Sequence, residues 1–173
     1  MEKIINDLLE DSSRFWLLDG AMGTQLQKKG LPFGLQPELF NLSHPEIVTG
    51  IHREYIEAGS NIIYANTFGA NRKKLSGCGH SVQEVITAAV KNAKAANASA
   101  TQSLVALDIG PIGELLEPTG TLSFEEAYDI FAEEITAGVT AGADLIVLET
   151  MTDLYEVKAA VLAAKENTRL PVF

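Results

Sequence analysis

The chain lacks the features that mark secreted, membrane-spanning and nucleic-acid-binding proteins. Its 173 residues hold one cysteine, Cys78, which excludes an internal disulfide and fits a reducing compartment, so a cytoplasmic protein is expected. Thirteen basic residues against 23 acidic ones give a net charge of −10, which argues against nucleic acid or an anionic membrane surface as a partner. No apolar run approaches the length of a membrane span or of a signal-peptide core.

Two short segments look like ion-binding sites, but neither holds enough of the required residues. Arg72-Lys73-Lys74 is the largest basic cluster, and a solvated loop or helix start explains it better than a phosphate site. Cys78-Gly79-His80 offers one thiol and one imidazole, too few ligands for a closed zinc site. No Ser-His-Asp or Cys-His set can be assembled either, so the sequence predicts no catalytic residue and no metal ligand within the chain.

A regular alternation of strand and helix patterns fills most of the chain. Uninterrupted apolar runs, typical of buried parallel strands, occupy residues 16–18, 62–65, 104–107 and 145–148. Four helix-capping boxes lie between or after these runs, at Ser43 and Glu46, Ser81 and Glu84, Ser123 and Glu126, and Asp153 and Glu156. A short amphipathic helix is expected over residues 1–14, and Pro171-Val172-Phe173 reads as the start of a fifth strand. The order βαβαβαβα predicts a parallel sheet with right-handed crossovers.

A short internal repeat helps to distinguish between the possible α/β folds. Residues 58–67 and 141–150 both read helix end, Gly, apolar strand, polar residue, Thr, and their offset spans two strand–helix units. Repetition at that scale favours an α/β fold of the (β/α)8 TIM-barrel type over a doubly wound sheet. The chain supplies about (β/α)4 plus the start of strand 5, so residues 1–173 are expected to be the N-terminal half of a barrel. Half a barrel has two open sheet edges, which a C-terminal half or a second copy of the chain would close.

A polar or acidic residue follows each predicted strand: Asp19, Asn66, Asp108 and Glu149. Ligands bind at this end of the sheet in α/β folds, so the four residues together predict a site for a small polar molecule. Simpler interpretations stay open, namely that Asp19 caps a turn, that Asn66 makes turn hydrogen bonds and that Asp108 braces loops. Glu149 comes after four apolar residues, where a buried carboxylate needs a partner, and contact with a ligand is favoured there.

Several motifs, in the right order and spacing, carry a resemblance to a known family. They are Leu17-Leu18-Asp19-Gly20-Ala21-Met22-Gly23-Thr24, Glu57-Ala58-Gly59-Ser60-Asn61 leading to Asn66-Thr67-Phe68-Gly69-Ala70, Asp108-Ile109-Gly110-Pro111 with Gly113-Glu114, and Glu149-Thr150. From about Phe15 onward the chain resembles the homocysteine S-methyltransferase family, and most closely the N-terminal homocysteine-binding module of the cobalamin-dependent methionine synthases. The resemblance implies a TIM barrel that binds homocysteine and transfers a methyl group to its thiol, which makes methionine.

The resemblance also implies a role for each residue of the site. Asp19 and Glu149 would hold the amine of homocysteine. Its carboxylate would be held by Thr67 and by the backbone amides of the turn Gly20, Ala21, Met22, Gly23 and Thr24. Asn66 and Asp108 would support the mouth of the barrel. These roles suit a zwitterionic amino acid, which needs anionic groups at one end and hydrogen-bond donors at the other.

The family's zinc site is the part of the pattern that this chain does not contain. In the family, three cysteines in the second half of the barrel hold Zn2+, and Cys78 matches none of them. A free thiol has a pKa of about 8.5, and coordination to zinc deprotonates it. The chain alone is therefore expected not to activate homocysteine. The methyl donor would be methylcobalamin, carried on a separate module, or another electrophile.

Two other functions remain open from the sequence. The chain is a half-barrel assembly module that closes by dimerisation, or it belongs to another small-molecule TIM-barrel enzyme. The second alternative would use a strand-end carboxylate, Asp108 or Glu149, as a base.

Overall fold

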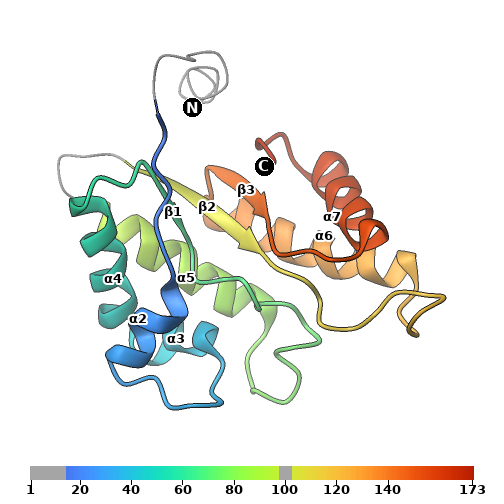
Figure 1. Ribbon diagram of the computed structural model, residues 1–173, viewed down its shortest axis with the longest axis horizontal. Coiled ribbons are helices and arrows are strands. Elements are labelled where there is room, and N and C mark those ends of the chain that lie inside the picture. Colours follow the sequence, from blue (N-terminus) through green and yellow to red (C-terminus); the bar gives the residue numbers. More distant parts are fainter. Residues whose placement is uncertain (1–14, 98–102) are drawn as a thin grey trace.

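A parallel sheet lies at the centre of the computed structural model, which describes residues 15–97 and 103–173. The helix expected over residues 1–14 lies outside the described part of the chain. The strands, in spatial order, are β1 (Ile62–Tyr64), β2 (Leu104–Ile109) and β3 (Leu145–Leu148) (Figure 1). Parallel strands that neighbour one another in chain order are typical of a barrel, because a doubly wound sheet reverses its order at a switch point.

The first and fifth expected strands are reduced to single bridges. Leu18 pairs with Ile62 of β1, and Val172 pairs with Ile146 of β3, both in the parallel sense. These two segments therefore extend the sheet at its two edges in the order of the sequence. Each has a pairing partner on one side only among the described residues, which limits its regular hydrogen bonding.

The boundary of β2 also differs from the prediction. The strand runs through Asp108 to Ile109, whereas the apolar run in the sequence predicts an end at Leu107. Pairing with β3 explains the extension, since Asp108 is aligned with Val147 in the parallel register. Asp108 is therefore held by the sheet itself and not by a flexible loop.

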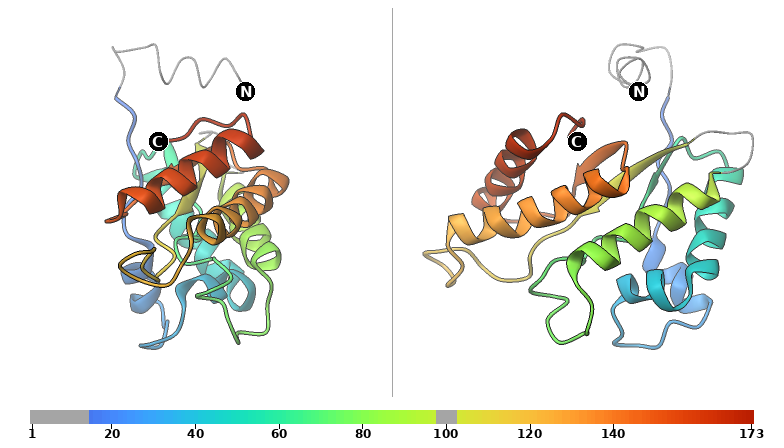
Figure 2. Two further views of the ribbon diagram at one scale, coloured as in Figure 1. Left: turned by 90° about the vertical axis from the view of Figure 1, so that its right-hand side faces the viewer. Right: turned by 180° about the vertical axis from the view of Figure 1, so that it is seen from behind.

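Four long helices cover one face of the sheet: α4 (Pro45–Glu57), α5 (Val82–Ala96), α6 (Phe124–Ala141) and α7 (Leu154–Asn167). Each helix packs against the next along the chain, so that they follow one another around this face (Figure 1 and Figure 2). The strand side chains on this face are fully buried beneath them: Ile63, Val105, Leu107 and Ile146. This arrangement confirms the α/β, TIM-barrel-type fold. Among the described helices, none is both long enough and apolar enough to cross a membrane.

Ser81 and Glu84 form the capping box predicted at the start of α5. The Ser81 hydroxyl accepts a hydrogen bond from the Glu84 N–H at 3.2 Å, and the Glu84 carboxylate accepts one from the Ser81 N–H at 2.8 Å. Only half of the box predicted at the start of α6 forms: Ser123 accepts from the Glu126 N–H at 3.1 Å, whereas the Glu126 carboxylate pairs with Lys73 at 2.8 Å. Both serines satisfy amide groups that the first turn of a helix leaves without partners.

The box predicted at Ser43 is wrong. Helix α4 begins at Pro45, and His44 occupies the cap position without a side-chain hydrogen bond. Ser43 belongs instead to a preceding short helix, and its hydroxyl donates to the Leu39 carbonyl at 3.1 Å. The remaining short elements of this region are α2 (Met22–Lys28), the 3-10 helix η1 (Pro37–Leu39) and α3 (Phe40–Ser43).

The box predicted at Asp153 is half right. Asp153 caps α7 by accepting from the Tyr155 N–H at 2.7 Å. Glu156 does not reach back to the cap, because it is buried and accepts a hydrogen bond from the Ile112 N–H at 2.7 Å. Glu156 thereby ties α7 to the loop that follows β2.

The internal repeat corresponds to two helix ends of the same geometry. Gly59 and Gly142 both have positive φ, +107° and +94°. In each case the glycine N–H bonds three residues back, and the next N–H bonds five residues back, as in a Schellman motif. Glycine suits both positions because a left-handed backbone crowds a Cβ atom. The two apolar strands then begin at equivalent points, Ile62 and Leu145.

The close packing of α6 on β2 leads to a first prediction. A Cβ atom at Gly138 would lie 2.5 Å from Cδ2 of the fully buried Leu107. We expect Gly138→Ala to lower the free energy of unfolding by about 1–3 kcal/mol, because the overpacked core must shift. Urea unfolding followed by circular dichroism measures the change.

Gly50 provides the matched control, since it lies inside α4 and a Cβ there would meet no atom within 4 Å. Gly50→Ala should raise the free energy of unfolding by up to about 1 kcal/mol through helix propensity alone. Equal effects of the two substitutions would contradict the packing argument.

Candidate functional site

A cavity of about 490 Å3 opens at the carboxyl ends of the strands. Its lining consists of Asp19, Gly20, Ala21, Met22, Gly23, Pro37, Glu38, Tyr64, Ala65, Asn66, Phe68, Asp108, Glu149 and Thr150. All four strand-end residues picked out from the sequence are therefore brought together. Two of the expected site residues, Thr24 and Thr67, are not part of the lining.

Asp19 is positioned by the backbone of the neighbouring strand. Its Oδ2 accepts a hydrogen bond from the Tyr64 N–H at 3.0 Å, and its own N–H donates to the Ile62 carbonyl at 3.0 Å. Burial raises the pKa of Asp19 from 3.8 to about 7, although backbone hydrogen bonds lower it in part. The negative charge of nearby Glu149 raises it further. A nearby cation would lower the pKa of this carboxyl group and stabilise its ionised form.

Asp108 is a buried carboxyl group of the cavity. It is only 7% exposed, and its Oδ1 has no hydrogen-bond partner among the described residues. Burial raises its pKa to about 8, and the charges of Glu149, Asp19 and Glu38 raise it as well. The bracing role considered for Asp108 belongs to its backbone, because its side chain binds no loop.

Glu149 and Thr150 form the rim above β3. The Glu149 N–H donates to the Ile109 carbonyl at 3.0 Å, which continues the pairing of β3 with β2 beyond the last strand residue. Thr150 has φ of +58°, in the left-handed region that β-branched residues rarely adopt. Strained residues of this kind gather at binding sites, where the surrounding structure holds them in place.

The turn that follows the Leu18 bridge leads directly into a helix. Gly20 and Ala21 precede α2, and Met22, Gly23 and Thr24 form its first turn. Amide groups in the first turn have no partner within the helix, so the predicted donors are present. Thr24 is exposed and is not part of the cavity lining. The turn is held in place by Tyr55, whose hydroxyl donates to the Ala21 carbonyl at 3.1 Å.

Thr67 connects two neighbouring strands and is not part of the cavity lining. Its side chain is fully buried, and its hydroxyl donates to the Asp108 carbonyl at 2.7 Å and accepts from the Asp108 N–H at 3.1 Å. These bonds tie the end of β1 to β2. With both functions of the hydroxyl used, Thr67 has no free donor for a carboxylate.

Asn66 connects the end of β1 to the segment around Pro37 and Asn41. Its Nδ2 donates to the Pro37 carbonyl at 2.8 Å and to Asn41 Oδ1 at 3.2 Å. Asn41 in turn donates to the Asn66 carbonyl at 2.8 Å. The two amide side chains thereby attach the η1–α3 segment to the end of β1.

Sequence reasoning missed Glu38, Tyr64 and Phe68. Glu38 lies far from any strand end in the sequence, yet its Oε1 accepts from the Gly69 N–H at 2.7 Å and the residue lines the cavity. Tyr64 lies inside the apolar run 62–65, so its position gave no separate signal of a site, yet it lines the cavity. Phe68 stood in a quoted motif without a role, although aromatic residues beside strand-end polar groups are a usable signal.

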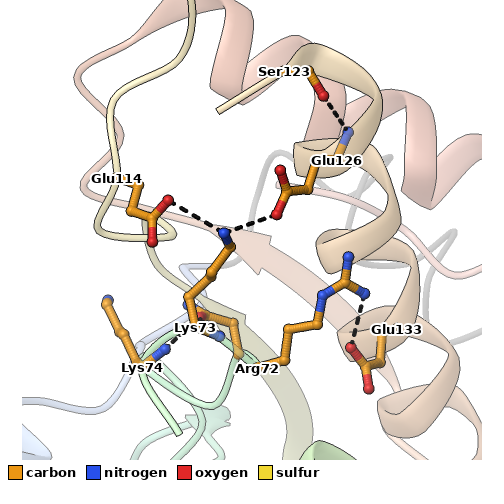
Figure 3. A network of polar contacts seen from close by, with 8 residues as sticks. Arg72, Lys73, Lys74, Glu114, Ser123, Glu126 and Glu133 are labelled. Atoms are coloured by element: carbon orange, nitrogen blue, oxygen red, sulfur yellow. Dashed lines mark hydrogen bonds and ion pairs between the residues drawn. The ribbon is translucent and has the colours of Figure 1, made fainter. Parts of the chain in front are cut away.

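The basic cluster Arg72-Lys73-Lys74 does not form an anion site. Arg72 pairs with Glu133 at 3.2 Å, and Lys73 pairs with Glu114 at 3.3 Å and Glu126 at 2.8 Å (Figure 3). These pairs attach the loop after β1 to α6 and to the loop after β2. The side chains are partly exposed, so the pairs orient the loops more than they stabilise the fold.

One more carboxyl group is buried, but it lies outside the cavity lining. Glu134 on α6 is 1% exposed, and both of its oxygens lack partners among the described residues. Burial raises its pKa well above the ordinary value, with a smaller opposing effect of Lys74. Burial therefore disfavours the ionised form of Glu134, and the residue is not part of the cavity lining.

The described residues do not fit the zinc that the resemblance implies. They contain no group of three or more His, Cys, Asp or Glu residues arranged to hold a metal ion. The thiol of Cys78 interacts with the backbone of His80 and lies outside the cavity.

The composition of the cavity lining determines what it can bind. Four carboxyl groups line it, those of Asp19, Glu38, Asp108 and Glu149, and no described Lys, Arg or His side chain does so. Such a cavity attracts cations and repels anions. Backbone amides at the start of α2 are the complementary donors for one anionic group.

The burial of Asp108 leads to a prediction about pH. From about pH 4 to about pH 8 the unfolded chain has lost the Asp108 proton and the folded chain keeps it, so stability falls as pH rises. Above about pH 8 both states are ionised and the full penalty is present. We expect Asp108→Asn to be more stable than the parent at high pH, by on the order of 2 kcal/mol, with a smaller difference at about pH 5.

Urea unfolding at several pH values measures this difference. Asp129→Asn, at an exposed position of α6, is the control and should leave the pH dependence unchanged. Parallel stability curves for Asp108→Asn and the parent would show that Asp108 is ionised at little cost.

Comparisons with known proteins agree with the geometry. The family model described as homocysteine S-methyltransferase matches residues 16–173. A methionine synthase from Mycobacterium leprae is 31% identical over 187 residues, which cover 96% of this chain and 15% of that protein. Homocysteine S-methyltransferase 1 from Brassica oleracea var. italica is 26% identical and is covered over 60% of its length.

A solved structure supports the fold. The homocysteine methyltransferase MmuM from Escherichia coli, in its oxidized form, superposes with a TM-score of 0.84 at 24% identity. The match covers 98% of this chain and 64% of that one. The chain thus spans about one seventh of the bacterial methionine synthase and less than two thirds of the two shorter relatives.

Proposed function

The chain belongs to the homocysteine S-methyltransferase family, and from this premise we propose that its cavity is the homocysteine-binding part of an enzyme that methylates the homocysteine thiol to give methionine. The observation that carries the proposal is the set of four cavity carboxyl groups with no basic side chain beside them. An amino acid brings the ammonium group that such a set requires. Its own carboxylate is placed where the cavity offers backbone donors.

Asp19 and Glu149 are the proposed ligands of the ammonium group. Asp19 is held by the Tyr64 N–H, and the negative charge of Glu149 acts on it directly. A bound ammonium group would lower the pKa of Asp19 from about 7 and favour its ionised form. Homocysteine binding is thereby coupled to loss of a proton from the cavity.

The carboxylate of homocysteine is assigned to the turn before and within α2. The amides of Met22, Gly23 and Thr24 lie in the first helical turn, where the backbone carries partial positive charge. Thr67 is left out of this set because its hydroxyl is committed to the backbone of Asp108.

The methyl transfer itself requires more than this chain. We assign to the described residues the binding and orientation of the amino acid, and to other parts of the enzyme the activation of the thiol. The donor implied by the methionine synthase resemblance is methylcobalamin, presented by a separate module. The chain alone is proposed to bind homocysteine without methylating it.

Isothermal titration with L-homocysteine under reducing conditions tests the proposal. Glu149→Gln and Asp19→Asn should each weaken binding by about 10-fold or more, because each removes a charged hydrogen-bond partner of the ammonium group. Binding should also tighten as pH rises through about 7, since Asp19 ionises in that range.

Glu54→Gln is the matched control, because Glu54 pairs with Lys29 on the surface and does not line the cavity. Unchanged affinity in the two cavity variants would refute the assigned roles. Binding of another metabolite in preference to homocysteine would favour a different small-molecule enzyme of the same fold.

A second candidate, assembly through the sheet edges, rests on exposed apolar side chains. Leu17 and Leu18 at one edge are 56% and 51% exposed, and Phe173 at the other is 50% exposed. We propose that these edges pair with the remaining strands of a barrel, supplied by a C-terminal half or by a second copy of the chain.

Native mass measurement, by light scattering after size exclusion, distinguishes these partners. A dimer of twice 18.6 kDa would show that two copies close on each other, whereas a C-terminal half added in trans would convert monomer to heterodimer. Leu18→Lys should prevent either assembly. A well-behaved monomer that ignores the added half would refute the assembly proposal.

A further inference from the structure

Tyr64 is a cavity side chain that the proposed function has not used. It is the last residue of β1, and it is half-buried while it lines the cavity. Its ring packs on one side against the apolar cluster of the inner sheet face, formed by Ile62, Leu104, Ala106, Leu145 and Val147. Tyr64 therefore lies at the boundary between the apolar interior and the carboxyl groups of the mouth.

The strand register explains this position. Tyr64 is aligned with Ala106 on β2, and Ala106 is aligned with Leu145 on β3. Side chains two residues apart share a face, so Asp108 stands one layer nearer the mouth than Ala106. The small methyl group of Ala106 leaves room beside it for the large ring of Tyr64. The ring is thus placed just below the layer of carboxyl groups.

The electrostatic surroundings of Tyr64 are entirely acidic. Burial raises the pKa of its phenol, and so do the charges of Glu149, Asp108 and Asp19, in that order. The phenol hydroxyl has no hydrogen-bond partner among the described residues. An aromatic ring surrounded by carboxylates is an arrangement that binds cations, through the ring quadrupole and the surrounding charges together.

The other aromatic residue of the cavity lacks this freedom. Lys74 Nζ already lies 5.1 Å from the ring centroid of Phe68, and that ring also packs closely on Gly110. Tyr64 has no Lys or Arg over its ring within residues 15–97 and 103–173. It is the cavity aromatic that remains available to a ligand cation.

We propose that Tyr64 is a specificity-determining residue, whose ring forms the floor beneath a ligand ammonium group held by Asp19 and Glu149. The identity of the ligand as homocysteine rests on the proposed function. The preference of the site for cations rests on the cavity alone. The ring selects amino acids over their deaminated analogues. The assigned contact is with the ring, and the hydroxyl contributes less.

Paired titrations with Tyr64→Leu and Tyr64→Phe test the inference. L-homocysteine carries the ammonium group, and 4-mercaptobutanoate lacks it while keeping the thiol and the carboxylate. Tyr64→Leu should weaken homocysteine binding by about 3- to 30-fold and leave the affinity for 4-mercaptobutanoate within about twofold. Tyr64→Phe, which keeps the ring, should bind homocysteine nearly as well as the parent. A structural defect would weaken both ligands alike.

Butylammonium and 1-butanol provide a second pair of probes that does not depend on homocysteine. Their binding is followed by the backbone amide shifts of Asp19 and Tyr64. We expect butylammonium, and not butanol, to shift these amides in the parent and to lose affinity in Tyr64→Leu. Tyr128→Leu is the control, since Tyr128 lies on α6 and bonds Glu166 outside the cavity.

The outcomes separate the two proposals. If homocysteine fails to bind while butylammonium binds in a Tyr64-dependent way, the proposed function fails and the aromatic floor stands. If homocysteine binds but Tyr64→Leu weakens it no more than 4-mercaptobutanoate, the floor is overturned and the proposed function stands. If the parent does not distinguish butylammonium from butanol and homocysteine does not bind, both are overturned.

Discussion

Parallel pairing of consecutive strands is the interaction on which the site depends. It places the carboxyl ends of the strands at the same edge of the sheet. Asp19 and Glu149 therefore interact electrostatically although more than a hundred positions separate them in the sequence. Turn geometry at Gly59 and Gly142 sets where two of these strands begin. A shift of one residue in either strand would exchange its inner and outer faces, which would remove Tyr64 of β1 or Glu149 after β3 from the cavity.

The gathering of carboxyl groups is unfavourable for the fold and useful for the site. Asp19 and Asp108 have raised pKa values because burial and like charges oppose their ionisation. A ligand cation offsets both effects, because its positive charge favours the ionised form of carboxyl groups that burial and like charges otherwise keep protonated. Natural proteins commonly trade stability for function in this way at their binding sites.

Side chains from distant segments hold the mouth in shape. Thr67 joins β1 to the backbone of Asp108, Asn66 joins it to Asn41, and Glu38 binds the Gly69 N–H. Each of these polar groups is buried and has a partner, which makes the loops rigid around a cavity whose own carboxyl groups have few partners. The division between satisfied and unsatisfied groups marks the boundary between framework and site.

Much of this could be predicted from the sequence, because the relevant signals are local. The apolar runs, the Ser81 capping box and the glycine at each helix end depend on neighbouring residues only, and so does the position of Asp19, Asn66, Asp108 and Glu149 near strand ends. The tertiary structure alone decided which side chains face the cavity. The Thr67 hydroxyl bonds the backbone of β2, and Glu38 lines the cavity although its segment has no strand pattern. Tyr64 lines the cavity although it lies within an apolar run. Their roles depend on partners far away in the chain, and a hydrogen bond or a strand register with such a partner has no signature in the local sequence.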